Sequence, residues 1–365
     1  MKFTVSTETM QRLVSRVIKG ASNNKLLPLT SFVNISLKDK RLRLDTTDMT
    51  NYTSAIEYNV EGEDFEIVVE LDNFSKIVSK TTSETITLEL NENSLKFVGN
   101  GTYNISLPIN EEGNPIKFPM YEFIPTKDPV TIEYDDIKSI ITANKSCIAN
   151  DMSVPVLNYY YCGDEVISAN QNNICLNSIT LFDEPILISN TMMDLIGLFG
   201  DTTIQVERSD NAIKFSSANY CVYGKVFDAI ADYPAEPIEA YLTSPFAYNC
   251  KVNKDLLLGA MDRLIIFTDK MDDGTLNMKF NKKSITLLNK DNTSYETIPY
   301  LNIIDSNEDV EYNCSISYDL LKNQVASNST ETIDLYFGDD NDACIKIVDT
   351  INNNTITKIT SLQEQ

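Results

Sequence analysis

The sequence predicts an α+β fold made of three tandem domains, and three observations predict it. A β-hairpin pattern occurs three times along the 365-residue chain, a short helix precedes each hairpin, and a longer amphipathic helix opens each repeat. The repeat is about 120 residues long, which suits a whole domain better than a solenoid unit. We therefore expect each copy to pack its helices on antiparallel sheets around a core of its own.

The three hairpins are recognised by alternation. Residues 85–97, TITLELNENSLKF, alternate apolar and polar side chains on both sides of a polar turn. Residues 203–215, TIQVERSDNAIKF, and residues 332–347, TIDLYFGDDNDACIKI, repeat this pattern. Each hairpin is expected to turn one face to the helices and the other to solvent.

A short helix is predicted just before each hairpin. Residues 71–80 offer Asp72 or Asn73 as the helix cap, residues 189–199 offer Ser189 or Asn190, and residues 317–327 begin with Ser317. One such helix is a weak signal, but three in register with three hairpins support a repeated domain. Their apolar faces are expected to bury Phe74, Ile77, Val78, Leu320, Leu321 and Val325.

A longer helix opens each repeat after a short strand. It is expected near residues 8–20 in the first repeat, and within residues 130–148 and 248–267 in the other two. The apolar stripes are Met10, Leu13, Val14, Val17 and Ile18; Ile137, Ile140, Ile141 and Ile148; and Leu256, Leu257, Ala260, Met261 and Leu264. Alternating strands follow, as in residues 32–48 and 276–289. The order strand, long helix, strands, short helix, strands suggests an internal twofold in each domain.

Proline-containing stretches separate the repeats. The stretch IPTKDP lies between Pro125 and Pro129, and YLTSPF contains Pro245. We therefore place the first domain at residues 1–126, the second at 127–244 and the third at 245–365.

Composition excludes several classes of function. The chain has no histidine, which removes Ser-His-Asp and Cys-His nucleophile systems and histidine-ligated metals. Its seven cysteines are scattered and never form a CxxC pair, and no glycine-rich phosphate loop is found. We expect a protein that is not an enzyme and has no metal or cofactor. The start MKFTVSTETM has no apolar signal-peptide core and no run is long enough to cross a membrane, so a soluble cytoplasmic protein is expected.

The distribution of charge modifies a simple expectation. A net charge of −23 would repel nucleic acid if it were evenly spread. The predicted helices, however, carry a modest basic stripe, with Arg12, Arg16 and Lys19 on one face of the first. The acid gathers in strands and loops such as residues 61–66. Each basic stripe alone is equally well explained as a solvated helix face, but helices sharing one surface would attract phosphates without reading sequence.

These features together resemble a known family, the bacterial β sliding clamp, which is the beta subunit of DNA polymerase III. The resemblance covers essentially the whole chain. It is carried by the opening MKFTV, by LPLTSFVNISLKDKRLRLDTTDM at residues 27–49, by PVLN at 155–158, by FDAIADYP at 227–234 and by SYDLL at 317–321. The order and spacing of these segments along three domains carry the assignment.

The resemblance implies a head-to-tail homodimer that closes a six-domain ring, with helices lining the hole and antiparallel sheets outside. Such a ring encircles duplex DNA, slides without reading sequence, and tethers the replicative polymerase; it binds polymerase and clamp loader through short peptide motifs. The residues expected to face DNA are Arg12, Arg16, Lys19, Lys25, Lys76, Lys80, Lys138, Lys145, Lys254, Arg263, Lys270 and Lys322. The short helix at residues 189–199 has no basic residue, so the stripe is expected to be interrupted there.

The same resemblance implies a dimer interface between the first domain and the partner's third domain. The matching positions are Tyr103, Ile105, Leu107, Ile265, Ile266 and Phe267. Ordinary core packing at a strand edge and a helix end is the alternative explanation.

The resemblance also implies a cleft for partner peptides between the second and third domains. The matching positions are Leu157, Asn170, Asn172, Asn173, Ile174, Leu176, Pro237, Ile238, Ala343, Cys344, Ile356, Ile359 and Leu362. Two segments depart from the family. The TDGHRL loop is replaced by NQNNICL, which loses a basic residue and the glycine, and the hydrophobic-proline tail is replaced by TKITSLQEQ. These departures suggest a divergent clamp with altered peptide preference, and raise the hypothesis of a phage or other mobile element as its source.

Two alternatives stay open at this point. A clamp-like ring could serve transcription activation or DNA repair instead of replication, since either role uses the same ring and cleft. An acidic multidomain β protein without a DNA role is the other, and the basic helices disfavour it.

Overall fold

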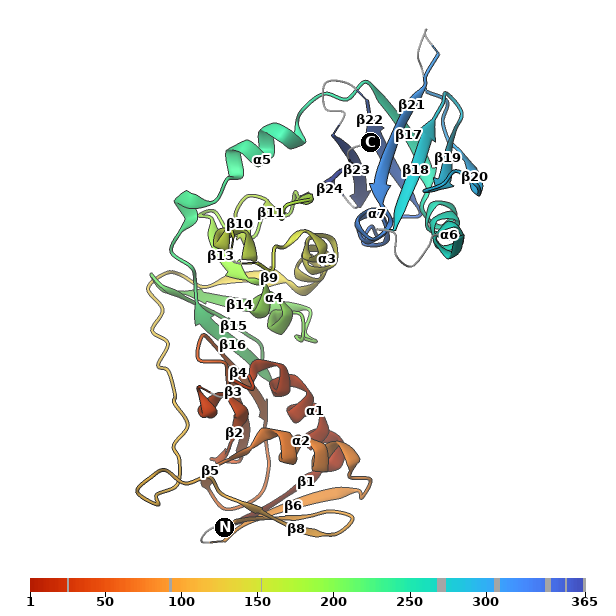
Figure 1. Ribbon diagram of the computed structural model, residues 1–365. Coiled ribbons are helices and arrows are strands. Elements are labelled where there is room, and N and C mark those ends of the chain that lie inside the picture. Colours follow the sequence, from red (N-terminus) through yellow and green to blue (C-terminus); the bar gives the residue numbers. More distant parts are fainter. Residues whose placement is uncertain are drawn as a thin grey trace. The chain divides into compact units, whose positions relative to one another are not determined.

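The computed structural model describes residues 1–24, 26–91, 94–151, 153–267, 274–304, 309–338, 343–351 and 353–363. Within them the chain forms 24 strands and seven α-helices, ordered as six repeats of strand, helix and three strands, with one extra helix, α5, between the fourth and fifth repeats (Figure 1). Each predicted domain therefore holds two such repeats, as the internal twofold implied.

The elements of the first predicted domain are β1 (Lys2–Ser6), α1 (Thr7–Val17), β2 (Phe32–Lys38), β3 (Arg41–Thr47), β4 (Asn51–Glu57), β5 (Phe65–Glu70), α2 (Leu71–Lys80), β6 (Thr85–Leu90), β7 (Ser94–Val98) and β8 (Thr102–Ser106). Those of the second are β9 (Val130–Glu133), α3 (Tyr134–Asn144), β10 (Tyr159–Cys162), β11 (Val166–Ala169), β12 (Asn173–Asn177), β13 (Ile186–Ser189), α4 (Asn190–Ile196), β14 (Thr203–Arg208), β15 (Ala212–Ser216) and β16 (Tyr220–Lys225).

After α5 (Ala235–Leu242), the third comprises β17 (Tyr248–Asn253), α6 (Lys254–Leu264), β18 (Thr275–Phe280), β19 (Ser284–Asn289), β20 (Tyr295–Pro299), β21 (Tyr312–Ser317), α7 (Tyr318–Ala326), β22 (Thr332–Phe337), β23 (Cys344–Ile351) and β24 (Asn354–Ser361). Short 3₁₀ turns include η1 (Ile18–Gly20), η2 (Pro28–Ser31), η3 (Lys145–Cys147), η4 (Pro155–Asn158) and η6 (Ile265–Phe267).

The chain divides into two compact units, each built on two antiparallel sheets. Unit 1 holds residues 1–137 and 191–226, and unit 2 holds residues 138–190 and 227–365. Unit 1 contains the sheets β5-β2-β3-β4-β16-β15-β14-β9 and β1-β6-β7-β8. Unit 2 contains β13-β10-β11-β12-β24-β23-β22-β17 and β20-β19-β18-β21. The predicted middle domain is thus shared between the units, because one half of it extends a sheet of each neighbour; its limits remain a prediction.

In each eight-stranded sheet, one strand pair joins two of the predicted domains. In unit 1, β16 pairs with β4, with Tyr220 opposite Ala55. The rings of Tyr52 and Tyr223 stack across this pair with centroids 4.9 Å apart. Tyr121, in the linker between β8 and β9, stacks on both rings. In unit 2, β12 pairs with β24, with Ile174 opposite Ile359. These pairs satisfy strand edges that would otherwise be open.

All three predicted hairpins are confirmed. They are β6–β7, β14–β15 and β22–β23, and each is antiparallel. In the first, Ile86, Leu88, Leu95 and Phe97 are fully buried while the intervening side chains are not. The alternation therefore sets the buried face, as its period of two requires.

The six predicted helices are confirmed, with corrections to their ends. α2 begins at Leu71, so its cap is Glu70 rather than Asp72 or Asn73. α7 is capped by Ser317 as expected, although the serine side chain makes no capping hydrogen bond. The working side-chain caps are on the long helices, where Ser6 accepts from the Thr9 amide and Asn253 from the Leu256 amide.

Two residues assigned to buried helix stripes lie in solvent instead. Ile18 is 43% exposed because the α-helix ends at Val17 and the chain tightens into η1, which rotates the next side chain outward. Leu256 is 53% exposed in the first turn of α6, where it flanks the buried Leu257. The helix α5 was not predicted; the predicted linker YLTSPF, residues 241–246, overlaps only its last two residues.

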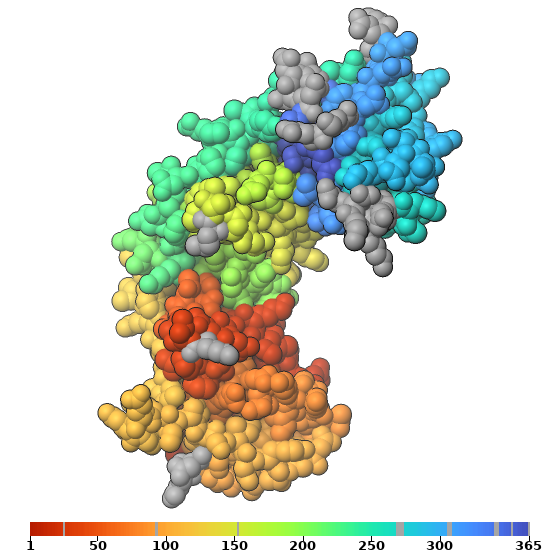
Figure 2. Space-filling view, viewed as in Figure 1, coloured from red at the N-terminus to blue at the C-terminus, as the bar shows by residue number. Residues whose placement is uncertain are grey.

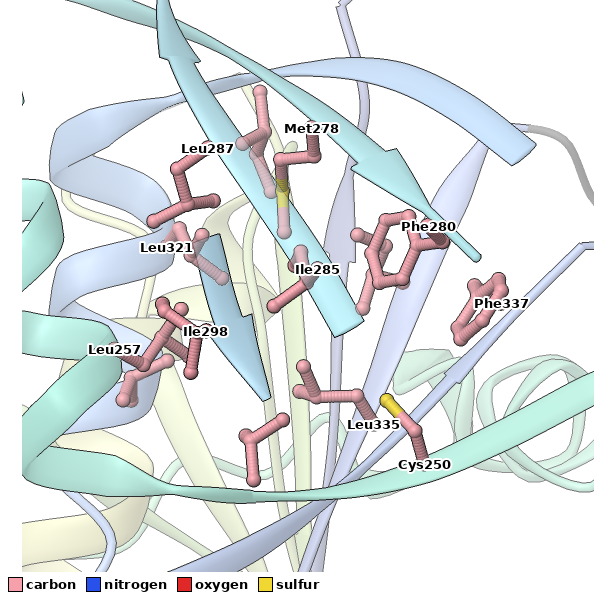
Figure 3. Packing of buried hydrophobic residues seen from close by; sticks show 14 of the residues in the cluster. Cys250, Leu257, Met278, Phe280, Ile285, Leu287, Ile298, Leu321, Leu335 and Phe337 are labelled. Atoms are coloured by element: carbon pink, nitrogen blue, oxygen red, sulfur yellow. The ribbon is translucent and has the colours of Figure 1, made fainter. Parts of the chain in front are cut away.

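The core of the third predicted domain shows how helices and sheets pack (Figure 3). Leu257 of α6 and Leu321 of α7 point between the strands toward Met278, Ile285 and Leu287. The rings of Phe280 and Phe337 stack with centroids 4.0 Å apart and link the four-stranded sheet to β22. Each such buried side chain contributes about 1.5–3 kcal/mol of transfer free energy. α6 contacts α7 as α1 contacts α2, so the first and third predicted domains each carry a helix pair on their sheets. None of the described helices is long and apolar enough to cross a membrane.

Candidate functional site

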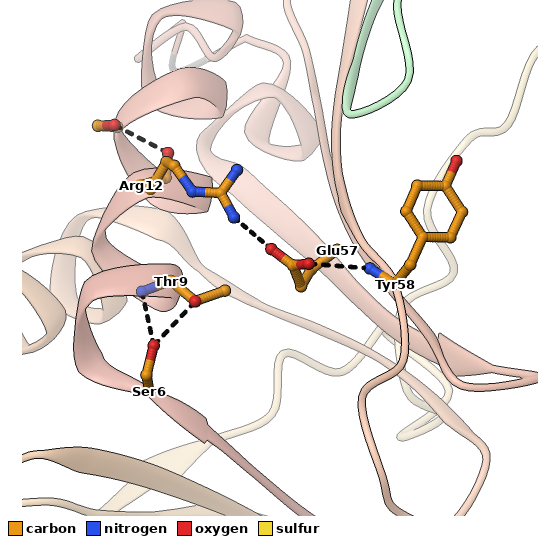
Figure 4. A network of polar contacts seen from close by, with 6 residues as sticks. Ser6, Thr9, Arg12, Glu57 and Tyr58 are labelled. Atoms are coloured by element: carbon orange, nitrogen blue, oxygen red, sulfur yellow. Dashed lines mark hydrogen bonds and ion pairs between the residues drawn. The ribbon is translucent and has the colours of Figure 1, made fainter.

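The basic side chains of α1 are held by contacts within unit 1. The Arg12 guanidinium pairs with Glu57 at the end of β4, and Glu57 also accepts the Tyr58 amide (Figure 4). One turn along, the Arg16 guanidinium carbon lies 5.7 Å from the centre of the Tyr220 ring on β16. Both arginines are half-buried, so each is partly withdrawn from the solvent-facing side of the helix.

The lysines of the first domain are more open. Lys19 in η1 and Lys80 at the end of α2 are exposed, and neither has an ion pair among the described residues. Lys76 is also exposed, but its ammonium lies 2.6 Å from the Asp72 carboxylate one turn earlier. An exposed pair of this kind contributes little to stability, yet it halves the charge that α2 presents.

In the middle domain, Lys138 on α3 and Lys145 in η3 are exposed. The first turn of α3 also carries two acids, Asp135 and Asp136, and burial together with the neighbouring Asp135 raises the pKa of Asp136. Among its described residues α4 has no basic side chain, which agrees with the predicted interruption of the stripe.

The basic residues of the third domain are the most fully compensated. Lys254 donates to the Asn328 carbonyl at 2.9 Å. Arg263 donates to both carboxylate oxygens of Glu296, each at 2.7 Å. Lys322 lies 2.9 Å from Asp262 and donates to the Tyr318 hydroxyl at 2.7 Å, contacts that raise its pKa and lower that of Asp262. The two remaining predicted positions, Lys25 and Lys270, lie outside the described residues.

An apolar cluster in unit 2 gathers six of the thirteen predicted cleft residues. Ile238 of α5, Cys344 of β23 and Ile359 of β24 are buried in it, and Leu157, Ile174 and Leu176 pack against it half-exposed. Residues that the sequence prediction missed complete the cluster: Val156, Ile167, Ala169, Leu187, Tyr233 and Leu242. β11 is buried at all four positions, so its short and mostly apolar run could have suggested Ile167 and Ala169.

The other predicted cleft positions differ in their surroundings. Asn170 shapes the turn before β12 by accepting the amides of Asn172 and Asn173, at 3.0 and 2.8 Å. Asn173 is buried, whereas Pro237 and Ala343 are exposed. Ile356 packs in a separate cluster with Ala143, Cys147 and Cys175. Leu362 packs against the third-domain core, although its amide donates to the Ala343 carbonyl.

A cation beside this cluster was also missed. The Lys346 ammonium donates to the Leu242 carbonyl at the end of α5 and lies about 5 Å from two ring centres, at 4.8 Å for Phe246 and 5.0 Å for Tyr336. Burial lowers its pKa. This basic residue belongs to β23, so the sequence of the loop at residues 170–176 could not reveal it.

The predicted interface residues lie in two places, at the open strand edge β8 and in the 3₁₀ turn η6. β8 is the edge of one four-stranded sheet, with Tyr103 44% exposed, Ile105 half-buried, and Leu107 half-buried just past the strand. In unit 2, Ile266 and Phe267 are 74% and 64% exposed in η6, and Ile265 is half-buried. The prediction missed β20, the open edge of the other four-stranded sheet, where Tyr295 is 68% exposed.

In the described residues, no group of three or more histidine, cysteine or acidic side chains could hold a metal ion. The described cysteines are free thiols, six buried and Cys221 partly so.

Comparisons with known proteins agree on one family. Residues 1–114 match the family described as DNA polymerase III beta subunit, N-terminal domain. A curated β sliding clamp from Rickettsia felis is 23% identical over 291 residues, which is 73% of this chain and 73% of that protein.

Solved structures share the fold along the whole chain. The sliding clamp of Bacillus subtilis superposes with a TM-score of 0.85 at 17% identity and covers 100% of this chain and 99% of its own. A sliding clamp from Pseudomonas aeruginosa, solved bound to griselimycin, superposes with a TM-score of 0.84 at 15% identity and covers both chains fully.

Proposed function

We propose, from the premise that this chain belongs to the DNA polymerase III beta subunit family, that it is a DNA sliding clamp, a non-catalytic processivity factor that encircles duplex DNA and tethers a polymerase. The proposal needs a closed ring, a surface that tolerates DNA without gripping it, and a place where partners dock.

Strand topology is the single observation that carries the ring. Within the chain, β4 of the first predicted domain pairs with β16 of the second, and β12 of the second pairs with β24 of the third. Each joint combines the third strand after a long helix with the third strand after a short one. β20 and β8 occupy the same two positions after their helices, but in the described chain each is a sheet edge with a strand partner on one side only.

We infer that β20 of one copy pairs with β8 of another, and β8 of the first with β20 of the second. This head-to-tail contact repeats the two internal joints, so six half-domain joints close two chains into a ring. The exposed Ile266 and Phe267 of η6, which follows α6, and Tyr103 on β8 supply the apolar surface that such an interface requires. The family resemblance also assigned Ile105, Leu107 and Ile265 to this interface, and the proposed pairing adds the strand β20 to it.

A weak hold on DNA suits sliding. Six of the twelve predicted DNA-facing residues are balanced by an acid, a carbonyl group or a ring of the same chain, and two more, Lys25 and Lys270, lie outside the described residues. The other four, Lys19, Lys80, Lys138 and Lys145, are exposed to solvent. Fewer phosphate contacts mean fewer released counterions and a shallow salt dependence. Retention then depends on the closed ring rather than on affinity.

Partners are proposed to dock a short peptide on the apolar cluster of unit 2. Leu157, Ile174 and Leu176 are half-exposed at its edge, and apolar side chains exposed beside a buried cluster suit an apolar peptide anchor. Polymerase and clamp loader are the expected partners. The same surface would serve a clamp recruited to transcription activation or repair, and a pull-down with purified polymerase separates these roles.

The test of the proposal is retention on circular DNA and loss from linear DNA. A cytoplasmic location follows from this role, and a phage or mobile-element source stays a hypothesis.

A further inference from the structure

Unit 1 contains a large cavity that, apart from Leu107, shares no residue with the predicted interface or the peptide cleft. It has a volume of about 1580 Å³ and lies between the start of β2, the strand β5, the ends of β1 and β6, and the linker after β8. Phe32, Val68, Leu107, Ile116 and Phe118 give it apolar walls. The linker, yellow-orange in Figure 2, lies at the surface of the unit.

We propose that this cavity is a second docking groove, which takes an extended peptide that adds as a strand to β5 and places one lysine or arginine over Glu66. The proposal goes beyond the sliding ring and does not depend on it.

The strand β5 is suited to this use because it is an edge. It pairs with β2 on one side, with Val68 opposite Asn34, and with no strand on the other side among the described residues. Its residues Glu66, Ile67 and Val68 line the cavity. An edge strand offers unpaired backbone groups every second residue, and an extended segment can satisfy them.

The far wall is a small hairpin of the linker. The Asn110 amide donates to the Asn114 carbonyl at 2.8 Å, and the Ile116 amide donates to the Pro108 carbonyl at 3.1 Å. Asn110 Oδ1 also accepts two amides inside the turn, and Gly113 takes a φ of +82°. The wall is therefore held by its own hydrogen bonds and leaves the edge of β5 uncovered.

Polar groups at the base of the groove favour a cationic side chain. Asn34 is 1% exposed and its amide donates to Asp45 at 3.2 Å and to Glu66 at 3.1 Å, while its Oδ1 has no hydrogen-bond partner among the described residues. Asp45 is balanced by Arg43, whose Nε lies 2.5 Å from it. Glu66 has no ion pair in the described chain, so the base carries an unbalanced carboxylate and an unused acceptor.

The remaining charged groups do not cancel this carboxylate. Lys117 lines the same cavity but is exposed on the linker. A smaller cavity of about 450 Å³ adjoins through Asn34 and Glu66 and adds Lys38, Arg41 and Asp64. The two basic side chains are exposed, and Asp64 accepts the Asp39 amide. A donor that enters beside Glu66 would form a charge-assisted hydrogen bond.

The test uses the full chain and a defined probe, the heptapeptide SVLKLVS with blocked ends. Hydrogen exchange followed by mass spectrometry reports protection of residues 62–70. We expect saturable protection, an apparent Kd raised about fivefold by Glu66→Gln, and one raised more than about tenfold by Glu66→Lys. Glu70→Gln is the matched control, since Glu70 is an exposed carboxylate on the same strand outside the cavity, and it should leave the Kd unchanged.

Three results would overturn the proposal. They are no protection of residues 62–70 at about 1 mM peptide, equal protection by a peptide with glutamate in place of its lysine, and an unchanged Kd in Glu66→Lys. Because Glu66 is exposed, neither variant threatens folding, and retention on circular DNA should be unaltered by both.

Discussion

Arg263 on α6 and Glu296 on β20 form a two-pronged ion pair, with both guanidinium-to-carboxylate distances at 2.7 Å. The sequence assigned Arg263 to the DNA-facing set, but the carboxylate comes from a strand 33 residues further along the chain. The arginine lowers the pKa of Glu296, so the pair stays charged well below neutral pH. A basic residue on the helix surface is thus balanced within the fold.

Removing the carboxylate should release this arginine. In Glu296→Gln we expect tighter binding to a short linear duplex and a steeper dependence of log K on log salt, by about one phosphate contact for each copy. The measurement is a salt titration of duplex binding by fluorescence anisotropy. Asp319→Asn, which alters an exposed carboxylate on α7 that has no ion pair among the described residues, is the control. An unchanged salt slope would show that Arg263 does not face DNA.

A buried lysine should give unit 2 a distinct alkaline response. Lys358 is fully buried, and its ammonium donates to the Gln324 carbonyl at 3.2 Å, to Ser327 at 2.6 Å and to Asn328 at 3.1 Å. Burial lowers its pKa below 10.5 in the folded chain. The unfolded chain therefore binds this proton more tightly, and stability from this group rises as pH rises from the folded pKa toward 10.5.

The Lys358→Met variant isolates that contribution. It should lower the free energy of unfolding near neutral pH by about 1–3 kcal/mol, because three acceptors lose their donor. The gap between wild type and variant should widen toward pH 10, as measured by urea unfolding at several pH values. A gap that is constant or narrows with pH would contradict a depressed lysine pKa.

The proposed interface predicts a monomer when its apolar edge is charged. Ile266→Asp should weaken dimerisation by at least about thirtyfold, as expected for loss of a buried interface anchor. Ile266 is 74% exposed in the single chain, so the fold should survive, as far-ultraviolet circular dichroism can verify. Sedimentation velocity measures the outcome, and Ile124→Asp, at an exposed linker position, is the control. Unchanged dimers of Ile266→Asp would exclude this surface.

The partner surface can be tested with short peptides. A peptide that binds the unit 2 cluster should lose at least about tenfold in affinity to Ile174→Asp, since an apolar contact is replaced by a charge. Calorimetry is the measurement, with Ile124→Asp again as control. A peptide motif that binds ordinary bacterial sliding clamps should bind this chain more weakly than it binds the Bacillus subtilis clamp. Ordinary tight binding of that motif would contradict the divergent cleft.

Local patterns were sufficient to predict the elements of the fold. Ile86 and Phe97 follow the period of a strand, and Met10 to Val17 follow that of a helix, so hairpins and helices could be placed from a few residues each. The strand joints could not be predicted in this way, because β4 and β16 belong to different predicted domains and lie far apart in the sequence. The end of α1 before Ile18 was missed for a similar reason: tightening of the last turn has no clear sequence signature.

Site prediction was limited by partners that are distant in sequence. The Lys76–Asp72 pair spans one helical turn and was readable, whereas Arg12–Glu57 and Lys322–Asp262 join separate elements. Ile238 and Ile359 were predicted from the family resemblance, and both pack in one apolar cluster with Tyr233, which precedes α5. Lys346 on β23 lies beside this cluster and was not predicted. Cys344 fits the cluster, whereas Ile356 faces the opposite side of the same strand pair.

The central claim is a closed ring held on DNA by topology, and one measurement tests it most directly. The protein is loaded on a nicked circular duplex, unbound protein is removed, and the circle is cut once. The account predicts stable retention on the circle at high salt and rapid loss from the linear product. Retention after cutting, or no difference between circular and linear DNA, would contradict it.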